Sequence, residues 1–325
     1  MDEFALIERY FASAGVERPE VRLGVGDDAA LVAPPADHLA TIATDTIVSG
    51  VHFPPSLDPA AIGHRALAVN LSDLAAMGAT PAYALIALSL PSADATWLAP
   101  FAQAFSTLAQ AHGVAVIGGD TTRSDVLSVT VTAVGWLASD TVALTRSGAR
   151  VRDLLAVTGS PGDAAAGLAA LAQRQEGKQH RYLRQRFAFP QPRVACGRCL
   201  LPVASSAIDV SDGLLADAQK LAEASGVHLA IEAHRLPLSE ELTQCHDREA
   251  AERFALTGGD DYELLFTAPR ECELVLERIA QDVGCALTVI GEVRPVGDGR
   301  APGASVTRDG RTLPLPTAGY RHFHR

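Results

Sequence analysis

The amino-acid sequence predicts a two-domain protein that combines an α/β domain with an α+β domain. The chain has 325 residues, 48% of them hydrophobic, so it can bury one large core or two moderate ones, and its length favours two domains. Helical and strand-like hydrophobic periods alternate along it, which is typical of mixed helix and sheet proteins. The composition changes near residues 148–151, where a basic, glycine-containing connection leads into a new apolar run. We therefore expect domains over 1–149 and 150–325.

The first domain contains the clearest predicted elements. An amphipathic helix is indicated by Phe4, Ile7, Tyr10 and Phe11. Apolar runs predict strands at 39–43, 83–90, 114–118 and 127–137. The run LSVTVTAVGWL in the last of these has the strongest β pattern, and an open sheet of this kind is an aggregation hazard. We therefore expect the N-terminal sheet to be covered by dimerisation.

A long helix is predicted between the first two strands. Asp58 has the chemistry of an N-cap, Pro59 suits the first helical position, and Gly78 follows the last helical residue, Met77. The apolar stripe of this helix consists of Ile62, Ala66, Val69, Asp73 and Met77. A carboxylate on a buried face requires a cation or a strong donor opposite it. We expect such a partner for Asp73, the alternative being a frayed, exposed helix end.

A second helix is predicted over 94–112, ending at Gly113. Its stripe of Trp97, Phe101, Phe105 and Leu108 is interpreted as core. In the second domain, the polar segment 174–190 is expected to be an exposed excursion. The pair Cys196 and Cys199 forms a CxxC pattern, but no second CxxC follows, so we interpret both cysteines as small apolar residues of a helix after Pro192.

The charge pattern excludes some classes of partner. The net charge is −11, and no block of Lys or Arg is dense enough to follow a phosphate backbone, so nucleic acid is not an expected partner. The N-terminus lacks the pattern of a signal peptide, and no apolar stretch reaches the length of a membrane span. We expect a cytoplasmic protein that does not bind membranes. Five cysteines in such a chain favour reduced thiols over disulfides.

Acidic residues recur beside what look like strand ends. They lie in GVGDDAALV at 24–32, ATDTIVSG at 43–50, NLSDLAAMG at 70–78, IGGDTTRSD at 117–125, AIDVSDGL at 207–214 and TGGDDYELLF at 257–266. For a single stretch the simplest interpretation is a helix cap, for example by Ser211 or Asp212. Six such stretches in one chain instead favour a shared functional site.

These acidic residues are hard oxygen donors without a matching set of His or Cys, which favours Mg²⁺. They are Asp28, Asp45, Asp73, Asp120, Asp209 and Asp212. Two carboxylates about 4 Å apart repel by about 4 kcal/mol at an effective dielectric near 20, so a converging cluster needs cations. The Walker motif and the kinase loops HRD and DFG are absent. A nucleotide would therefore be held through metals, glycine turns and scattered donors such as Arg146.

A series of motifs spans nearly the whole chain. It runs GVGDDAAL, TDTIVSGVHF, ALAVNLSDLAAMGATP, IGGDTTR, ALTRSGA, VTGSPGDAAAGL, AIDVSDGL, TGGDDYEL and GYRHF. As a set, these motifs resemble the thiamine-monophosphate kinase family of the aminoimidazole-ribonucleotide-synthetase-like superfamily. The resemblance implies an N-terminal mixed sheet with helices that dimerises, and a C-terminal α+β domain that closes the active site. It also implies transfer of the γ-phosphoryl group of ATP to thiamine monophosphate, the last step of thiamine diphosphate biosynthesis, with several Mg²⁺ ions.

The resemblance assigns roles to individual residues. The matching metal ligands are Asp28, Thr44, Asp45, Asp73, Asp120, Asp209 and Asp212, of which Asp73, Asp120 and Asp209 would be catalytic. The matching nucleotide contacts are Gly119, Asp120, Arg146 and Ser211. The matching substrate contacts are His52, Asp260 and Tyr320. Two positions depart from the expected pattern: Asp260 replaces a Glu, which shortens the reach by one methylene, and Ala43 replaces a Ser that precedes the TDT threonine.

Other functions stay open at this point. A selenophosphate synthetase would carry a reactive Cys or selenocysteine near the N-terminus, and a hydrogenase-maturation protein would carry a C-terminal Cys. The first cysteine here is Cys196 and the chain ends RHFHR, so both fit poorly. A metal-dependent phosphate-binding or regulatory module without catalysis is the alternative from another class, and the intact acidic set argues against it.

Overall fold

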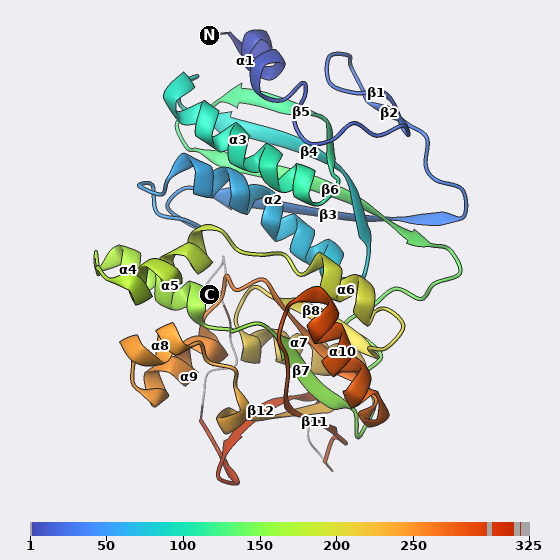
Figure 1. Cartoon of the computed structure of the whole chain (residues 1–325), viewed down its shortest axis with the longest axis vertical. Helices are drawn as coiled ribbons and strands as arrows, with labels where there is room; N and C mark the ends of the chain where they lie inside the picture. The colour runs from blue at the N-terminus through green and yellow to red at the C-terminus, as the bar shows by residue number, and fades with distance from the viewer. Residues whose placement is uncertain (1, 298–300, 315–318, 320–325) are drawn as a thin grey trace. The chain divides into compact units, whose positions relative to one another are not determined.

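The chain folds into two compact units, each with its own sheet (Figure 1). The structure is a computed structural model and describes residues 2–297, 301–314 and 319. The N-terminal unit comprises Met1–Leu74 and Ala79–Val142, and the C-terminal unit comprises Ala75–Gly78 and Ala143–Arg325. The predicted fold class, two units of mixed helix and sheet, is confirmed. In the described ranges, no helix is both long and apolar enough to cross a membrane.

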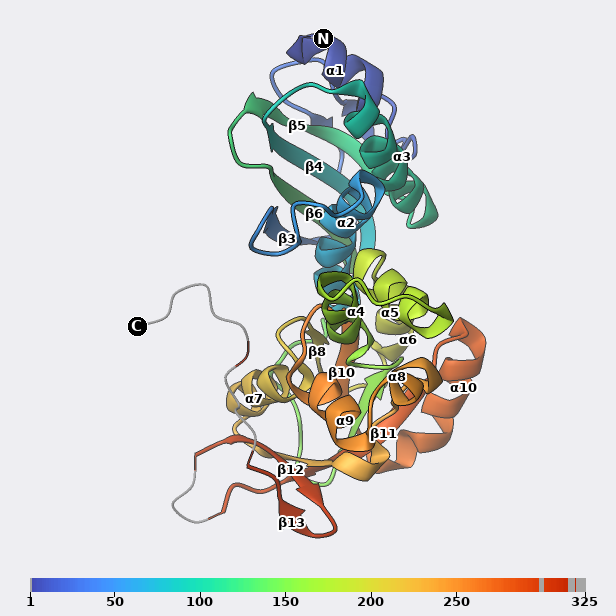
Figure 2. The same cartoon turned by 90° about the vertical axis from the view of Figure 1, so that its left-hand side faces the viewer.

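The N-terminal unit is built on a four-stranded sheet in the order β3-β6-β4-β5. These strands are β3 (His38–Val48), β6 (Ser128–Ala138), β4 (Thr80–Leu90) and β5 (Ala115–Arg123). The β4–β5 pair is parallel and the other two pairs are antiparallel. Helices α2 (Pro59–Ala76) and α3 (Ala95–Ala111) cover one face of the sheet, as the two views in Figures 1 and 2 show. The remaining elements are α1 (Glu3–Tyr10), β1 (Val21–Leu23) and β2 (Leu31–Val32).

The helices of this unit begin and end where the sequence predicts. Asp58 caps α2 by accepting from the amide of Ala60 at 2.8 Å, and Gly78 follows with a φ of 72°. Asp94 caps α3 in the same way, accepting from Thr96. The N-terminal helix is also present, but the expectation that Phe4 packs inside is wrong. Phe4 is 80% exposed, because the helix turns Leu6 toward the core instead.

One expectation about the sheet is wrong. Asp45 and Asp120 were expected at strand ends, yet both lie inside strands, paired with Val131 and Ala87 respectively. The strands continue past their apolar runs because the neighbouring strands supply hydrogen-bonding partners along their full length. The run LSVTVTAVGWL forms β6, which lies inside the sheet. The edge strands are β3 and β5, and Ile42 of β3 is 65% exposed.

The C-terminal unit is built on a seven-stranded sheet in the order β13-β12-β9-β11-β7-β10-β8. The strands are β7 (Leu154–Thr158), β8 (Ser206–Val210), β9 (His228–Glu232), β10 (Glu263–Ala268), β11 (Leu287–Arg294), β12 (Gly303–Arg308) and β13 (Arg311–Thr312). All pairs are antiparallel except β9–β12, which is parallel. The helices are α4 (Asp163–Ala172), α5 (Lys178–Ala188), α6 (Val194–Leu200), α7 (Leu214–Ser225), α8 (Glu240–Cys245), α9 (Arg248–Thr257) and α10 (Glu273–Val283). Leu214 and Leu221 of α7 pack with Ile208 and Leu265 of the sheet in one core.

The segment 174–190 is not the exposed excursion that its polar composition predicts. Most of it forms α5, in which Leu183 and Phe187 are fully buried. The apolar residues are few but lie four apart, so one face of the helix packs inward. The CxxC pattern lies in α6 as expected, with Cys196 buried but Cys199 exposed.

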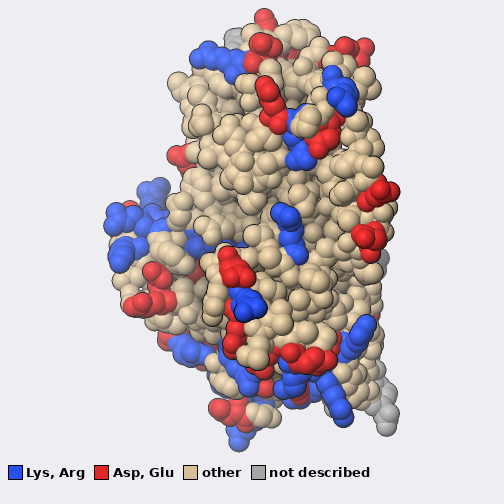
Figure 3. Space-filling model, turned by 45° about the vertical axis from the view of Figure 1, so that its right-hand side comes forward, with Lys and Arg blue, Asp and Glu red and all other residues tan. Residues whose placement is uncertain are grey.

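Charged side chains of both signs lie on the face shown in Figure 3, where they gather in the lower part and along the margins. Many of them form exposed ion pairs, such as that of Glu292 with both Arg270 and Arg294. Such exposed pairs contribute little to stability.

Candidate active site

In the N-terminal unit, the side chains of Asp45 and Asp73 meet. Asp45 lies in β3 and points toward the helix-covered face, and Asp73 lies near the end of α2. Partial desolvation raises the pKa of Asp45, while the hydrogen bond with Asp73 and the nearby imidazole of His52 partly oppose this rise. A hydrogen bond between two carboxyl groups requires a proton on one of them. The partner expected opposite Asp73 is therefore a second carboxyl, and the pair presents oxygen atoms of the kind that Mg²⁺ prefers.

Two neighbours hold this pair in place. The backbone amide of Asp45 donates to Oδ1 of Asn70 at 3.0 Å, and Asn70 Nδ2 donates to the Ala66 carbonyl at 3.1 Å. Asn70 is fully buried, so it fixes β3 against α2 through a satisfied amide. His52 accepts at Nδ1 from the amide of Val48 at 2.9 Å. The proton of the neutral ring therefore lies on Nε2, which is a donor.

Thr44 and Asp120 lie on the other face of the same sheet. The Thr44 hydroxyl contacts the Thr132 hydroxyl at 2.9 Å, and successive residues of a strand point to opposite faces. The Thr44 hydroxyl is therefore directed away from the Asp45 carboxyl. Asp120 is in register with Ala87 and is exposed. Since β6 and β4 separate β5 from β3, Asp120 lies about 14 Å from Asp45, three strand spacings away.

Gly119 occupies a position that only glycine tolerates. Its φ is 153°, and a Cβ atom there would lie 1.9 Å from the Ile86 carbonyl oxygen. The backbone before Asp120 can therefore approach β4 closely. Asp28 is exposed in the turn after β1, where its amide donates to Asp27 Oδ1 at 2.8 Å.

A surface cavity of about 440 Å³ lies in the N-terminal unit, next to the loop that begins at Ser49. Trp97 forms part of its wall and stacks on Phe101 with ring centroids 5.0 Å apart. Phe101 is core as expected, whereas Trp97 is only half-buried. The cavity is large enough for a small organic molecule.

In the C-terminal unit, two turns lie against each other and bring together four of the expected site residues. Asp209 is 6% exposed near the end of β8, and the turn of Ser211 and Asp212 follows it. The amide of Asp260 donates to the Ser211 carbonyl at 2.9 Å. The close approach requires Gly259, since a Cβ atom there would lie 2.3 Å from the same carbonyl oxygen. The structure thus places Asp209, Ser211, Asp212 and Asp260 at one end of the strand pair β8–β10.

The turn that carries Asp260 has a strained backbone. Asp260 and Tyr262 have φ values of 68° and 52°, a region that residues other than glycine adopt rarely. The Tyr262 hydroxyl donates to Asp260 Oδ1 at 3.2 Å, and the Tyr262 amide donates to the Val210 carbonyl. These contacts orient the Asp260 carboxylate, so Tyr262 is a second residue to consider beside it.

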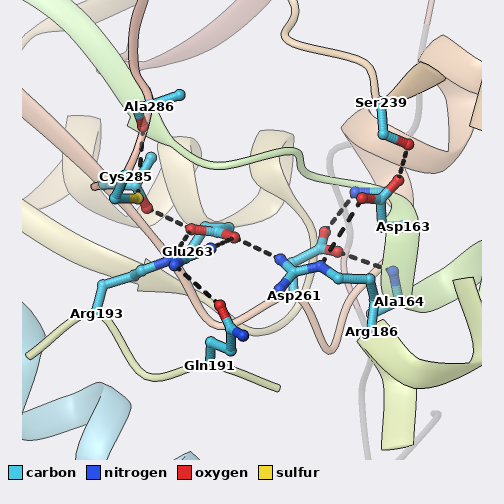
Figure 4. A network of polar contacts seen from close by, with 12 residues as sticks. Asp163, Ala164, Arg186, Gln191, Arg193, Ser239, Asp261, Glu263, Cys285 and Ala286 are labelled. Atoms are coloured by element: carbon cyan, nitrogen blue, oxygen red, sulfur yellow. Dashed lines mark hydrogen bonds and ion pairs between the residues drawn. The ribbon is translucent and has the colours of Figure 1, made fainter. Parts of the chain in front are cut away.

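Buried carboxylates next to this turn, those of Asp261 and Glu263, hold it through hydrogen bonds and ion pairs (Figure 4). Fully buried Asp261 accepts from the amides of Gly162 at 2.7 Å and Ala164 at 3.2 Å, and burial raises its pKa well above the usual range. Glu263 is also fully buried. Burial raises its pKa, but the charges and hydrogen bonds of Arg193 and Arg186 outweigh this and hold the pKa below its usual value. The strained backbone is therefore held by the packed structure around it.

The helix cap expected at Ser211 or Asp212 is wrong. Helix α7 begins after Gly213, which has no side-chain cap. Instead, Asp217 in the first turn of the helix accepts through Oδ2 from the amides of Ser211 at 3.0 Å and Asp212 at 2.9 Å. Lys220 contacts both Asp212 Oδ2 at 2.5 Å and Asp217 Oδ1 at 2.7 Å.

Arg146 lies away from Ser211. The amide of Ala207, at the start of β8, donates to the Thr145 carbonyl, and Ser225 at the end of α7 donates to the Arg146 carbonyl. Four residues of strand separate Ala207 from Ser211, about 13 Å. The expected substrate residue Tyr320 lies outside the described residues. The preceding Gly319 is described, and a Cβ atom there would lie 2.9 Å from Asp212.

The sequence did not reveal the residues that support the site. In the described part of the chain, no group of three or more His, Cys, Asp or Glu side chains has metal-binding geometry. Asn70, Asp217 and Lys220 were missed. The spacing of Asp217 from Asp212 was a usable signal, because residues near the start of a helix can reach the amides that precede it.

Comparison with known proteins first defines the class of the chain. Residues 26–137 match the N-terminal domain of the AIR synthase related protein family, and residues 150–302 match its C-terminal domain. The chain is 43% identical to the thiamine-monophosphate kinase of Escherichia coli (strain K12), with 99% of this chain and 98% of the relative covered.

Solved structures agree with this result. The crystal structure of thiamine-monophosphate kinase from Stenotrophomonas maltophilia K279a is 42% identical, with a TM-score of 0.87 over 96% of this chain and 98% of that one. A structure of AaThiL complexed with AMPPCP and TMP is 33% identical, with a TM-score of 0.78 over 92% of each chain. The chain belongs to the thiamine-monophosphate kinase family. This membership sets aside the selenophosphate-synthetase and hydrogenase-maturation alternatives.

Proposed function

We propose that this chain transfers the γ-phosphoryl group of ATP directly to the phosphate of thiamine monophosphate. An oxygen of the acceptor phosphate forms a bond to the γ-phosphorus, the bond from that phosphorus to the β–γ bridging oxygen breaks, and the products are thiamine diphosphate and ADP. The observation that carries the proposal is the contact between two turns that brings Ser211, Asp212 and Asp260 beside Asp209. The relative that holds AMPPCP and TMP together supports it.

The oxygen-only donor set fits Mg²⁺. In the N-terminal unit, Asp45 and Asp73 would hold the cation, since their side chains contact each other and a cation could lie between their oxygens. In the C-terminal unit, Asp209 and Asp212 would do so. Bound Mg²⁺ supplies charge neutralisation on the phosphates. Asp28, Asp120 and Thr44 stay proposed ligands on the family resemblance, Thr44 through its backbone because its hydroxyl faces Thr132.

Gly119, Asp120, Arg146 and Ser211 are the proposed nucleotide contacts. Because the backbone of Arg146 lies near the start of β8 and Ser211 follows its end, the two residues would contact different parts of the nucleotide. Gly119 would leave its backbone open to a phosphate, as its missing side chain allows.

The acceptor side comprises His52, Asp260 and Tyr320. His52 would donate from Nε2 to the acceptor phosphate, since Nδ1 is already occupied by the Val48 amide. Asp260, oriented by the Tyr262 hydroxyl, would accept from the amino group of the pyrimidine or face the cationic ring. Tyr320 would offer a flat ring to the heterocycle. The acceptor phosphate is itself the nucleophile, so the residues bind and align the reactants rather than abstract a proton.

We also propose that the N-terminal sheet pairs with that of a second copy. Its outer face carries exposed Ile42, Thr44 and Thr46 beside the edge of β3, and an exposed long edge strand of this kind favours pairing. Since the chain mass is 34.0 kDa, sedimentation should give a species of about 68 kDa. A monomer at micromolar concentration would contradict the pairing.

A coupled assay for ADP release, with and without thiamine monophosphate, tests the activity. We expect release that depends on thiamine monophosphate and on Mg²⁺, with thiamine diphosphate as the product. Asp73→Asn should lower turnover by at least about 100-fold. Asp58→Asn, at the cap of the same helix, should leave it unchanged because Asn caps as well as Asp.

Three results would argue against the proposal. ADP release without the acceptor would indicate a different reaction. Near-normal turnover of Asp73→Asn at saturating Mg²⁺ would show that catalysis does not need the carboxyl pair of Asp45 and Asp73. Radiolabel from γ-labelled ATP that stays on the denatured protein would indicate a phosphorylated enzyme rather than direct transfer.

A further inference from the structure

Asp217 is buried behind the turn that carries Ser211 and Asp212. Its Oδ2 accepts from the two amides of this turn at 3.0 and 2.9 Å, and its Oδ1 accepts from Lys220 Nζ at 2.7 Å. The residue is fully buried. Both oxygens are therefore committed to the protein itself, and neither faces a ligand.

We propose that Asp217 is a positioning residue, which fixes the backbone of this turn so that Ser211 and Asp212 are presented together to the nucleotide and its metal. This inference rests on the proposed function, because it uses the roles proposed there for Ser211 and Asp212. Asp217 acts through these two residues and does not itself contact a substrate.

The geometry of the turn explains why it needs an acceptor. The amides of Ser211 and Asp212 precede the first residue of α7, so no helical carbonyl is available to them. Gly213, between the turn and the helix, has a φ of 111°, which lets the chain reverse sharply before the helix begins. Without Asp217, two partly buried amides would lose their partner, and the turn would relax toward water to regain one.

The opposite side of the turn is held independently. The Ser211 carbonyl accepts from the Asp260 amide at 2.9 Å. Loss of the Asp217 carboxylate therefore removes the acceptor of the Ser211 and Asp212 amides, while the Ser211 carbonyl keeps its hydrogen bond with the Asp260 amide. We expect the contact with the Asp260 turn to survive, and with it binding of the acceptor.

Lys220 couples the same carboxylate to the side chain of Asp212. Its Nζ lies 2.5 Å from Asp212 Oδ2 and 2.7 Å from Asp217 Oδ1. Asp217 therefore orients both the backbone and, through Lys220, one carboxylate oxygen of Asp212. The Asp212 side chain is 31% exposed, so it stays accessible to a cation.

Four proteins provide the test: the wild type, Asp217→Ala, Asp217→Asn and the control Asp153→Ala. Asp153 is a matched control in the same unit, because it is 5% exposed and accepts from a backbone amide, that of Arg150, and from the Ser205 hydroxyl. Binding of a non-hydrolysable ATP analogue with Mg²⁺ is measured by calorimetry. The Michaelis constants for ATP and thiamine monophosphate are measured in the same proteins.

We expect Asp217→Ala to weaken analogue binding and to raise the Michaelis constant for ATP by about tenfold or more. The constant for thiamine monophosphate should stay within about threefold. Asp217→Asn should weaken analogue binding less than Asp217→Ala does, because its amide oxygen can still accept from both backbone amides although its NH2 group cannot accept from Lys220. Asp153→Ala should lose stability but retain wild-type affinity.

The inference is overturned if Asp217→Ala binds the analogue as the wild type does, if Asp217→Asn is as weak as Asp217→Ala, or if the control weakens binding equally. Each of these leaves the proposed function intact. A wild type that binds no analogue would instead refute the proposed function and this inference with it.

Discussion

The Glu263→Gln substitution tests whether the buried carboxylate of β10 holds the C-terminal unit together. Glu263 accepts from Arg193 Nε and Nη2 at 2.6 Å each, from Arg186 Nη2 at 2.6 Å and from Thr158 Oγ1 at 2.5 Å. Gln keeps the shape but is neutral, and it turns an acceptor into a donor that faces a guanidinium group. Two arginine side chains, 13% and 15% exposed, would then lie in the interior without their counter-charge.

The expected loss of stability follows from this burial. Removing one partner of a buried ion pair costs about 3–5 kcal/mol, because the remaining charge is left uncompensated. With a urea dependence of about 2 kcal/mol per molar, the unfolding midpoint should fall by about 2 M.

Urea unfolding should be followed by circular dichroism and by tryptophan fluorescence. Both tryptophans, Trp97 and Trp136, lie in the N-terminal unit, so fluorescence reports that unit while circular dichroism reports both. A shift in circular dichroism without a shift in fluorescence would assign the loss to the C-terminal unit. Coincident shifts would mean that the two units unfold together.

Glu292→Gln is the matched control. Glu292 also has two arginine partners, Arg270 at 3.3 Å and Arg294 at 2.9 Å, but these side chains are 36–60% exposed. Exposed pairs contribute about 0–1 kcal/mol, so its midpoint should move by less than about 0.5 M. Equal shifts in the two variants, or a loss below about 1 kcal/mol for Glu263→Gln, would refute the reasoning.

Three further predictions follow from single residues. Burial raises the pKa of Asp163 to about 6, above its unfolded value, so the stability that it contributes is fully present below about pH 4 and is lost as the pH rises through about 6. Between pH 4 and 7 this should lower the unfolding free energy of the wild type by about 3 kcal/mol, and Asp163→Asn should remove that decline. Denaturant titrations at several pH values measure it, and a variant with the same decline would contradict the prediction. Gly259→Ala should lower kcat/KM by at least about tenfold, because the added Cβ atom forces the Asp260 turn away from Ser211. The control Gly226→Ala has open space around the new Cβ atom and should keep normal kinetics despite its positive φ. Tyr320→Ala should raise the Michaelis constant for thiamine monophosphate and leave that for ATP nearly unchanged, and equal effects on both substrates would make Tyr320 structural.

The elements that sequence predicted well are those with local signals. Helix α2 begins after Asp58 and is followed by Gly78 because capping and the positive φ of glycine depend on a few neighbouring residues. The succession of Asp209, Ser211 and Asp212 after an apolar strand likewise indicated the turn between β8 and α7. The motif order indicated the family for the same reason, since it is a property of the chain alone.

The features that sequence missed depend on contacts between distant segments. The polar composition of 174–190 suggested exposure, yet Arg186 lies inside because Glu263, 77 residues later, supplies a buried counter-charge. Asp45 and Asp120 appear in similar acidic motifs, but the sheet order puts two strands between theirs. The pairing of strands decides which carboxylates meet, and no local pattern encodes it.

The structure satisfies the carboxylates around the proposed site in three ways, and the difference separates acids that can bind a cation from acids that hold the fold. Asp45 and Asp73 contact each other, and Asp212 is paired with the single ammonium group of Lys220, which is 39% exposed. A neighbouring carboxyl or a mobile lysine head can move aside when a divalent cation arrives, because neither fills all the acceptor positions of its carboxylate. Glu263 instead receives guanidinium groups from two arginines on both of its oxygens. Its charge is neutralised by rigid planar donors that leave no position for a metal, so Glu263 belongs to the framework that carries the Asp260 turn.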